Sequence, residues 1–81
     1  MHYTYVLEST GRPGELYRGH TSDLRARLAA HNAGQCPHTA KFRPWRLRFY
    51  AAFPTIELAQ AFERYLKTGS GHAFASKHLG L

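Results

Sequence analysis

The sequence predicts an α+β domain: a small three-stranded antiparallel sheet flanked by helices, in the order β-β-α-β-α-α. Three observations predict this fold class. Two short alternating segments are separated by a loop rich in glycine and proline, a longer alternating segment follows, and helical periodicity occurs between and after them. Because 81 residues are the size of one domain, we expect a single unit over residues 1–81.

The first two strands are expected at residues 3–7 and 16–19. The connecting residues 9–15 contain two glycines and one proline, which is typical of a hairpin loop. This hairpin would bring Tyr5 and Tyr17 close together, since opposed side chains on one face of a sheet lie ~5 Å apart. Aromatic packing across the strands is the alternative explanation for this pair.

The first helix is expected to begin at a cap provided by Thr21 or Ser22 and to stop at Gly34. Within it, Arg27 and His31 lie four residues apart and therefore share one face. The pair forms either a solvated helix edge or a phosphate clamp with a proton-transfer partner.

A basic loop over residues 35–44 leads into the third strand at residues 45–53. In this strand one face is apolar, and the other carries two arginines and a tyrosine. Thr55 is expected to cap a second helix that runs to about residue 68, and a last short helix is expected over residues 70–78.

Glu63 is an acidic residue on the apolar stripe of the second helix, which also contains Ala59, Phe62 and Leu66. A buried carboxylate must be compensated, because an unpaired buried charge is costly. One explanation is an ion pair with an arginine, or with Lys67 one turn further on. The other is a metal site facing a cleft, since one carboxylate with waters and a substrate phosphate commonly holds Mg²⁺.

The charge of the chain points to a polyanionic partner. It has 11 Lys and Arg against 5 Asp and Glu, a formal net charge of +6. On so small a domain this favours nucleic acid, with simple solubility as the alternative. The candidate nucleic-acid-binding residues are His20, Lys41, Arg43, Arg46, Arg48 and Lys67.

The single cysteine excludes a disulfide scaffold and fits a reducing compartment. The start of the sequence has no leader pattern, and no apolar run reaches the length of a membrane span. We therefore expect a cytoplasmic protein that does not associate with membranes.

Together these residues resemble the motifs of the GIY-YIG nuclease domain, and more closely those of its small single-domain members. The resemblance covers nearly the whole chain, in a specific order and spacing. The segments that carry it are Tyr3-Thr4-Tyr5, Tyr17-Arg18-Gly19, Arg27-Leu28-x-x-His31, Arg43-Pro44-Trp45-x-Leu47 and the run from Ala61 to Gly71.

The resemblance implies a divalent-metal-dependent endonuclease that hydrolyses phosphodiester bonds of DNA, with RNA left open as a substrate. By position, it implies that Tyr17 activates the attacking water, that Tyr5 helps to position this water, and that Arg27 holds the scissile phosphate. It further implies that His31 assists proton transfer and that Glu63 holds one Mg²⁺ or Mn²⁺ ion.

Two other functions stay open at this point. One is a catalytically weak or inactive nucleic-acid-binding module on the same fold. Longer members of the family carry an asparagine after the metal-binding helix, and this chain has none beyond Asn32. The other is a protein–protein adaptor whose charge serves only solubility. The oligomeric state is open between monomer and homodimer.

Overall fold

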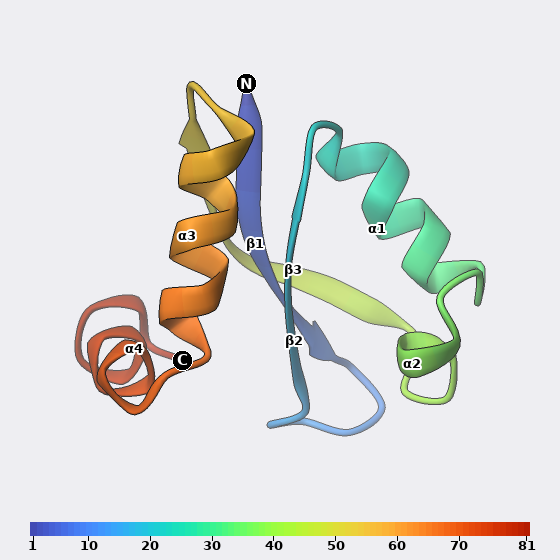
Figure 1. Ribbon diagram of the computed structural model, residues 1–81. Coiled ribbons are helices and arrows are strands. Elements are labelled where there is room, and N and C mark those ends of the chain that lie inside the picture. Colours follow the sequence, from blue (N-terminus) through green and yellow to red (C-terminus); the bar gives the residue numbers. More distant parts are fainter.

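The sheet and its helices follow the predicted order, which confirms the predicted fold class. A computed structural model describes residues 1–81 and contains one three-stranded antiparallel sheet of order β2-β1-β3 (Figure 1). The elements are β1 (His2–Ser9), β2 (Leu16–Thr21), α1 (Leu24–Asn32), α2 (Pro37–Ala40), β3 (Trp45–Phe53), α3 (Ile56–Leu66), α4 (Gly69–Phe74) and a π-helical turn (Ala75–Leu79).

The central strand β1 lies between two layers of helices. Thr4 and Tyr5 are consecutive, so their side chains point to opposite faces of the sheet. Thr4 Oγ1 donates a 2.6 Å hydrogen bond to the Ala59 carbonyl of α3, whereas the Tyr5 hydroxyl contacts His31 of α1. Helices α3 and α1 therefore cover opposite faces of the sheet (Figure 1), and residues 4–9 of β1 are buried.

A bulge in β3 divides the face that alternation predicts to be apolar. Strand β1 pairs Val6 with Phe49 but Leu7 with Leu47, so Arg48 has no partner on β1. Phe49 consequently packs against the core around Val6 on the α3 side, whereas Leu47 lies opposite Leu7 on the α1 side. The prediction of one apolar face along the whole strand is wrong, because one inserted residue reverses the alternation.

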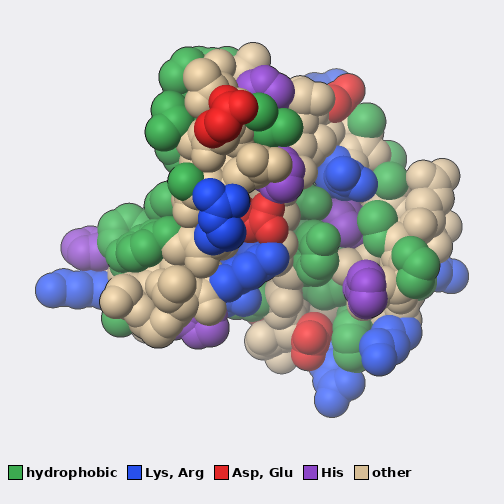
Figure 2. Space-filling view, viewed as in Figure 1, with side chains coloured by type: hydrophobic (Ala, Val, Ile, Leu, Met, Phe, Trp, Pro, Cys, Tyr) green, Lys and Arg blue, Asp and Glu red, His purple; other side chains and the backbone are tan.

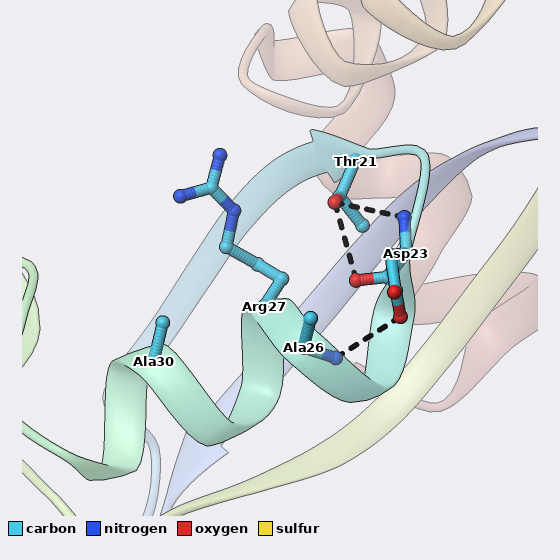
Figure 3. Close-up of a pocket in the computed structure, with 5 residues that line it drawn as sticks. All are labelled: Thr21, Asp23, Ala26, Arg27 and Ala30. Carbon is cyan, nitrogen blue, oxygen red and sulfur yellow. Dashed lines mark hydrogen bonds between the residues drawn. The ribbon is translucent and has the colours of Figure 1, made fainter.

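Side-chain and glycine caps set the ends of α1. Asp23, rather than the predicted Thr21 or Ser22, is the N-cap, and its carboxylate accepts a 3.1 Å hydrogen bond from the Ala26 amide (Figure 3). The Thr21 hydroxyl instead accepts a bond from the Asp23 amide and so fixes the preceding turn. Gly34, which follows the end of the helix, has a φ of +78° and is the stop that the sequence predicts.

Two segments differ from the sequence prediction. Residues 35–44 are not loop throughout, because the short helix α2 forms within them and begins at Pro37, a residue favoured in a first helical turn. The helix predicted over residues 70–78 is divided into α4 and the π-helical turn, and α4 starts after Thr68, whose hydroxyl caps it. Both differences lie away from the strands and do not alter the order of the sheet.

Helix α4 lies so close to the end of α3 that Gly71 has no room for a side chain. A Cβ at this position would lie 1.8 Å from the carbonyl oxygen of Tyr65. Replacing Gly71 by Ala is therefore expected to lower the free energy of unfolding by more than about 3 kcal/mol, as measured by urea denaturation. Gly69→Ala is the matched control, because a Cβ at Gly69 meets nothing within 4 Å. A Gly71→Ala protein as stable as the control would contradict this packing.

Candidate active site

A pocket of about 150 Å³ lies at the edge strand β2, where α1 and α3 approach the sheet from opposite faces. In this region, basic and histidine side chains gather around one acidic side chain (Figure 2). The pocket is lined by Tyr5, Tyr17, Gly19, His20, Arg27 and Glu63. All except Gly19 are residues that the sequence analysis singles out, so the fold brings both phenols, an arginine and a carboxylate to one place.

Strand pairing places the two phenols on one face. Tyr5 lies opposite Gly19 and Leu7 lies opposite Tyr17, so the tyrosines are diagonal neighbours whose ring centroids are 6.2 Å apart. A Cβ at Gly19 would lie 2.6 Å from the Tyr5 hydroxyl oxygen. Because Gly19 has no side chain, the ring and hydroxyl of Tyr5 have room beside it.

Behind Tyr5, a chain of hydrogen bonds leads away from the pocket. The Tyr5 hydroxyl lies 2.9 Å from His31 Nε2, and His31 Nδ1 lies 2.8 Å from Thr39 Oγ1. Because the Thr39 hydroxyl donates to the Cys36 carbonyl at 3.3 Å, we assign the Nδ1 proton to His31. With Nδ1 protonated, Nε2 accepts the hydrogen bond of the Tyr5 hydroxyl, whose oxygen keeps its lone pairs for other donors.

Burial fixes the resting protonation of this pair. Desolvation, reinforced by the nearby Tyr17, raises the pKa of Tyr5 well above its ordinary value of 10. Desolvation and the positive charge of Arg27 lower the pKa of His31 below its ordinary value of 6.5. At neutral pH, Tyr5 is thus a neutral phenol and His31 a neutral imidazole. His31 is 1% exposed, so it reaches the pocket only through Tyr5.

Glu63 lies on the opposite side of the pocket, and its side chain is 15% exposed. It is ion-paired, as one alternative of the sequence analysis expects, and it also lines the pocket, as the metal-site alternative requires. Lys67 Nζ donates a 2.7 Å bond to one carboxylate oxygen, and His20 Nδ1 bonds to the other. Burial opposes ionisation, but the bonds from Lys67 and His20 outweigh it and lower the pKa of Glu63. Glu63 is therefore an ionised carboxylate at neutral pH.

Arg27 lies between this pocket and a second hollow of about 220 Å³ along α1, and its side chain extends from the helix (Figure 3). Ala26 and Ala30 line that hollow with small side chains. Arg27 makes no ion pair with any of the acidic residues, in contrast to Lys67. Its guanidinium group is therefore free to bind an anion.

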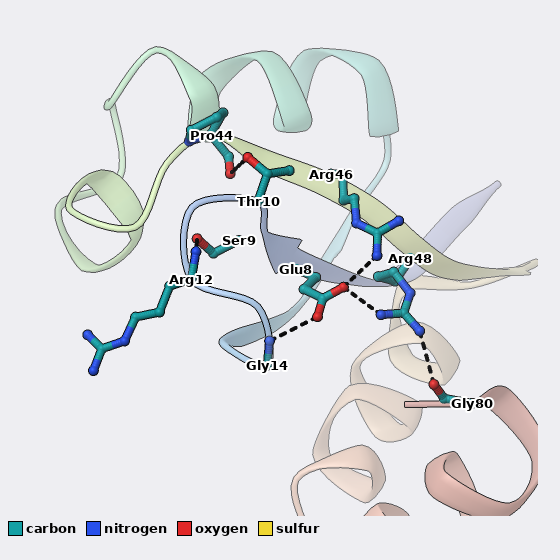
Figure 4. Close-up of polar contacts among 9 residues, drawn as sticks. All are labelled: Glu8, Ser9, Thr10, Arg12, Gly14, Pro44, Arg46, Arg48 and Gly80. Atoms are coloured by element: carbon teal, nitrogen blue, oxygen red, sulfur yellow. Dashed lines mark hydrogen bonds and ion pairs between the residues drawn. The ribbon is translucent and has the colours of Figure 1, made fainter.

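Two of the arginines predicted to bind nucleic acid make ion pairs elsewhere. Arg46 and Arg48 both bond to Glu8, and Arg48 also donates a 2.9 Å bond to the Gly80 carbonyl (Figure 4). A bond from the Gly14 amide and those from the two arginines lower the pKa of Glu8 to about 2. This cluster ties the hairpin loop and the C-terminal end of the chain to the sheet, and neither arginine lines the pocket.

Sequence reasoning missed Gly19 as a spacer and Thr39 as the end of the hydrogen-bond chain. Gly19 is part of the Tyr17-Arg18-Gly19 motif, but only the pairing with Tyr5 shows why it has no side chain. Thr39 falls within residues 35–44, where the sequence carries no signal of a buried polar contact. His20, expected to bind nucleic acid, bonds to Glu63.

The fold is of the nuclease type. The chain belongs to the GIY-YIG family, because residues 1–74 match the GIY-YIG catalytic domain. The resemblance stated from the sequence is thereby confirmed.

Within this family the chain is similar to UPF0213 proteins. It is 41% identical over 66 residues to a UPF0213 protein of Streptococcus pyogenes serotype M5 (strain Manfredo), covering 80% of this chain and 70% of that protein. A UPF0213 protein of serotype M1 gives the same identity and coverage. The solution NMR structure of a UPF0213 protein from Bacillus halodurans is 31% identical, with a TM-score of 0.56, and the alignment covers 98% of this chain and 86% of that chain.

GIY-YIG nucleases generally use divalent metal ions, and the pocket has one donor suited to such an ion. Glu63 is ionised there, and no group of three or more metal-binding side chains occurs in the chain. This donor set fits a hard cation held by one carboxylate with waters and phosphate oxygens, and does not fit a site closed by protein ligands. His20 and Lys67 each bond to one carboxylate oxygen of Glu63, so a metal ion must either displace these side chains or bind the oxygens alongside them.

None of the helices has both the length and the apolar character that crossing a membrane requires. The expected location in the cytoplasm stays a prediction.

Proposed function

We propose that this chain is a divalent-metal-dependent DNA endonuclease that hydrolyses phosphodiester bonds in the pocket between β2, α1 and α3. The observation that carries the proposal is the orientation of the Tyr5 hydroxyl. In the assigned tautomer its proton bonds to His31 Nε2, and Tyr5 lines a pocket that also contains Arg27 and an ionised Glu63.

The proton relay explains how a phenol serves as a base near neutral pH. Water bound in the pocket donates a hydrogen bond to the Tyr5 oxygen. As this water attacks phosphorus, the bond from phosphorus to the leaving sugar oxygen breaks, the proton of the water passes to Tyr5, and the Tyr5 proton passes to His31 Nε2. Solvent water protonates the leaving oxygen. No free phenolate is needed, which matters because burial raises the pKa of Tyr5. Thr39 keeps His31 in the tautomer that accepts this proton.

The other residues orient the reactants and neutralise charge. Tyr17 lines the pocket and its hydroxyl makes no hydrogen bond within the protein, so we assign it to orient the attacking water. This assignment exchanges the roles that the resemblance implies for Tyr5 and Tyr17. The unpaired guanidinium of Arg27 binds the scissile phosphate and stabilises the charge that develops on it. Glu63 would hold a Mg²⁺ or Mn²⁺ ion, whose chemistry is to neutralise charge on the phosphate and the leaving oxygen.

A nucleic-acid-binding module that does not cut is the second candidate function. It is favoured by the two bonds that hold both oxygens of Glu63, because a metal ion has to compete with His20 and Lys67 for them. The lack of a downstream asparagine favours it as well.

Cleavage of plasmid and branched DNA with Mg²⁺, Mn²⁺ or EDTA tests the proposal. Wild-type protein is expected to cut only with a metal ion, and Arg27→Ala is expected to cut about 10²-fold more slowly because one charge-stabilising group is lost. Arg25→Ala is the matched control, since Arg25 is an exposed arginine on the same helix that does not line this pocket. Wild-type protein that binds DNA without cutting it supports the binding module. Equal cutting by wild type and Arg27→Ala overturns the assigned site.

A further inference from the structure

Another polar hollow, distinct from the one along α1, lies between the β1–β2 hairpin loop and the loop that connects α2 to β3. It has a volume of about 340 Å³ and is lined by three cationic side chains together with Phe42, Ser9 and Gly11. The cationic residues are Arg12, Lys41 and Arg43. No acidic residue lines it, and none of the three cations makes an ion pair.

Uncharged groups hold the three cations in place. The Arg12 guanidinium lies 5.3 Å from the centre of the Phe42 ring, and Lys41 Nζ lies 5.2 Å from the same centre. Arg43 Nη1 donates a 3.3 Å bond to the Ala40 carbonyl and packs against Gly34, where a Cβ would lie 2.3 Å away. Three cationic residues thus line one hollow that has no acidic residue in its lining.

The loops that form this hollow are fixed to one another. Ser9 Oγ donates a 2.6 Å hydrogen bond to the Phe42 carbonyl, and the Thr10 amide donates a 2.9 Å bond to the Pro44 carbonyl. The side chain of Arg12 projects away from the ion pairs around Glu8 (Figure 4). The hollow is therefore a preorganised site and separate from the structural cluster of paired arginines.

The hollow shares no lining residue with the candidate active site, but side-chain contacts link the elements around the two. Helix α2 connects the two, because Thr39 bonds to His31 and the Trp45 indole donates a 2.9 Å bond to the Thr39 carbonyl. Trp45 in turn lies 6.4 Å from Tyr17, measured between ring centroids. These contacts link α2 and β3, the elements on either side of the loop that lines the hollow, to His31 and Tyr17 beside the active site.

We propose that this hollow binds a second backbone phosphate of the DNA molecule whose scissile phosphate lies at Arg27. The proposal rests on the proposed function, and it assigns Arg12, Lys41 and Arg43 to substrate binding outside the reacting centre. Two guanidinium forks suit the oxygens of a phosphate, and the lysine adds a point charge. Phosphate contacts of this kind carry affinity and position the substrate without reading its sequence.

Binding of a labelled 24-base-pair duplex in EDTA at several salt concentrations tests the inference. The variant Arg12→Gln/Lys41→Gln/Arg43→Gln is expected to bind the duplex at least ~10-fold more weakly. The plot of log binding constant against log salt concentration is expected to be shallower by about 0.9 for each phosphate that the protein no longer neutralises. The matched control is Arg25→Gln/Arg64→Gln/Lys77→Gln. It removes three exposed cations that make no ion pair, and so lowers the net charge equally. We expect the control to lose less than ~3-fold in affinity and to keep the slope.

The outcomes separate this inference from the proposed function. Equal weakening by both triple variants, with wild-type cleavage intact, shows only a general effect of charge and overturns the second phosphate site. Wild-type protein that neither binds nor cuts DNA overturns both the proposed function and this site. In cleavage assays the hollow variant is expected to raise KM and leave kcat unchanged, and a fall in kcat alone contradicts a role in binding. Thermal melts confirm that both variants fold.

Discussion

Replacing Tyr5 by Phe is expected to lower the rate of DNA cleavage by about 10²–10⁴-fold, the range typical for loss of a general base. The substitution keeps the aromatic ring over Gly19 and removes only the hydroxyl that links the pocket to His31. Single-turnover cleavage of a labelled duplex measures the effect on the chemical step.

Tyr17→Phe separates the roles of the two phenols. The Tyr17 hydroxyl has no partner within the protein, so its loss is expected to cost about 10-fold, less than the loss of the relay. If Tyr17→Phe is the slower of the two variants, the relay is wrong and Tyr17 itself activates the water.

The Tyr5→Phe substitution also leaves His31 Nε2 without its partner, so we expect the free energy of unfolding to fall by about 1–3 kcal/mol. Cleavage rates are therefore compared well below the melting temperature.

The pH profile distinguishes a chemical role of the relay from a structural one. The relay requires neutral His31, and the lowered pKa of this residue places the acidic decline in rate below pH 6.5 in wild-type protein. The same depressed pKa means that His31 contributes stability above pH 6.5 that is lost as the pH falls through its folded pKa. If Tyr5→Phe keeps the acidic decline of wild type within the pH range where it stays folded, the decline does not come from the relay.

Replacing Glu63 by Gln is expected to abolish metal-dependent cleavage and to weaken Mn²⁺ binding by at least ~10-fold. Gln keeps the size of the side chain but removes the negative charge, which is the only carboxylate charge in the pocket. Isothermal titration with Mn²⁺ measures binding without any need for activity.

Glu57→Gln is the matched control for Glu63, because it is an exposed acidic residue on the same helix with no ion pair. It changes net charge equally and is expected to leave both Mn²⁺ affinity and cleavage at wild-type levels. A Glu63→Gln protein that binds Mn²⁺ as wild type does shows that the metal site lies elsewhere. In that case Glu63 serves only to hold Lys67 and His20.

Local patterns were enough to predict the three strands, the two longer helices and their order, but not α2 or the division of the last helix. The strand at residues 45–53, the Thr55 cap and the stop at Gly34 all depend on residues that are close in sequence, and the structure has them where they were expected. The helical stripe likewise placed Ala59 and Leu66 in the core, because the period of 3.6 residues fixes which side chains share a face. The order and spacing of the motifs were also enough to identify the family.

The sequence also singled out the residues of the pocket, but not what each one contacts. It placed Arg27 and His31 on one helix face, and the structure shows one in the open pocket and the other buried behind Tyr5. It offered two explanations for Glu63; the structure shows the ion pair with Lys67 and places Glu63 at a pocket, and the metal site stays a prediction.

Only the tertiary structure decided the contacts between residues that are far apart in the chain. The bulge at Arg48 reverses the faces of β3, Gly19 makes room for Tyr5, and Arg12 joins Lys41 and Arg43 around one hollow. A periodic pattern says which residues share a face, but strand register and loop packing determine which side chains meet across the fold. The sequence by itself thus determined the family and all the residues that line the pocket except Gly19. Packing decided how protons, charges and phosphate-binding groups are arranged around it.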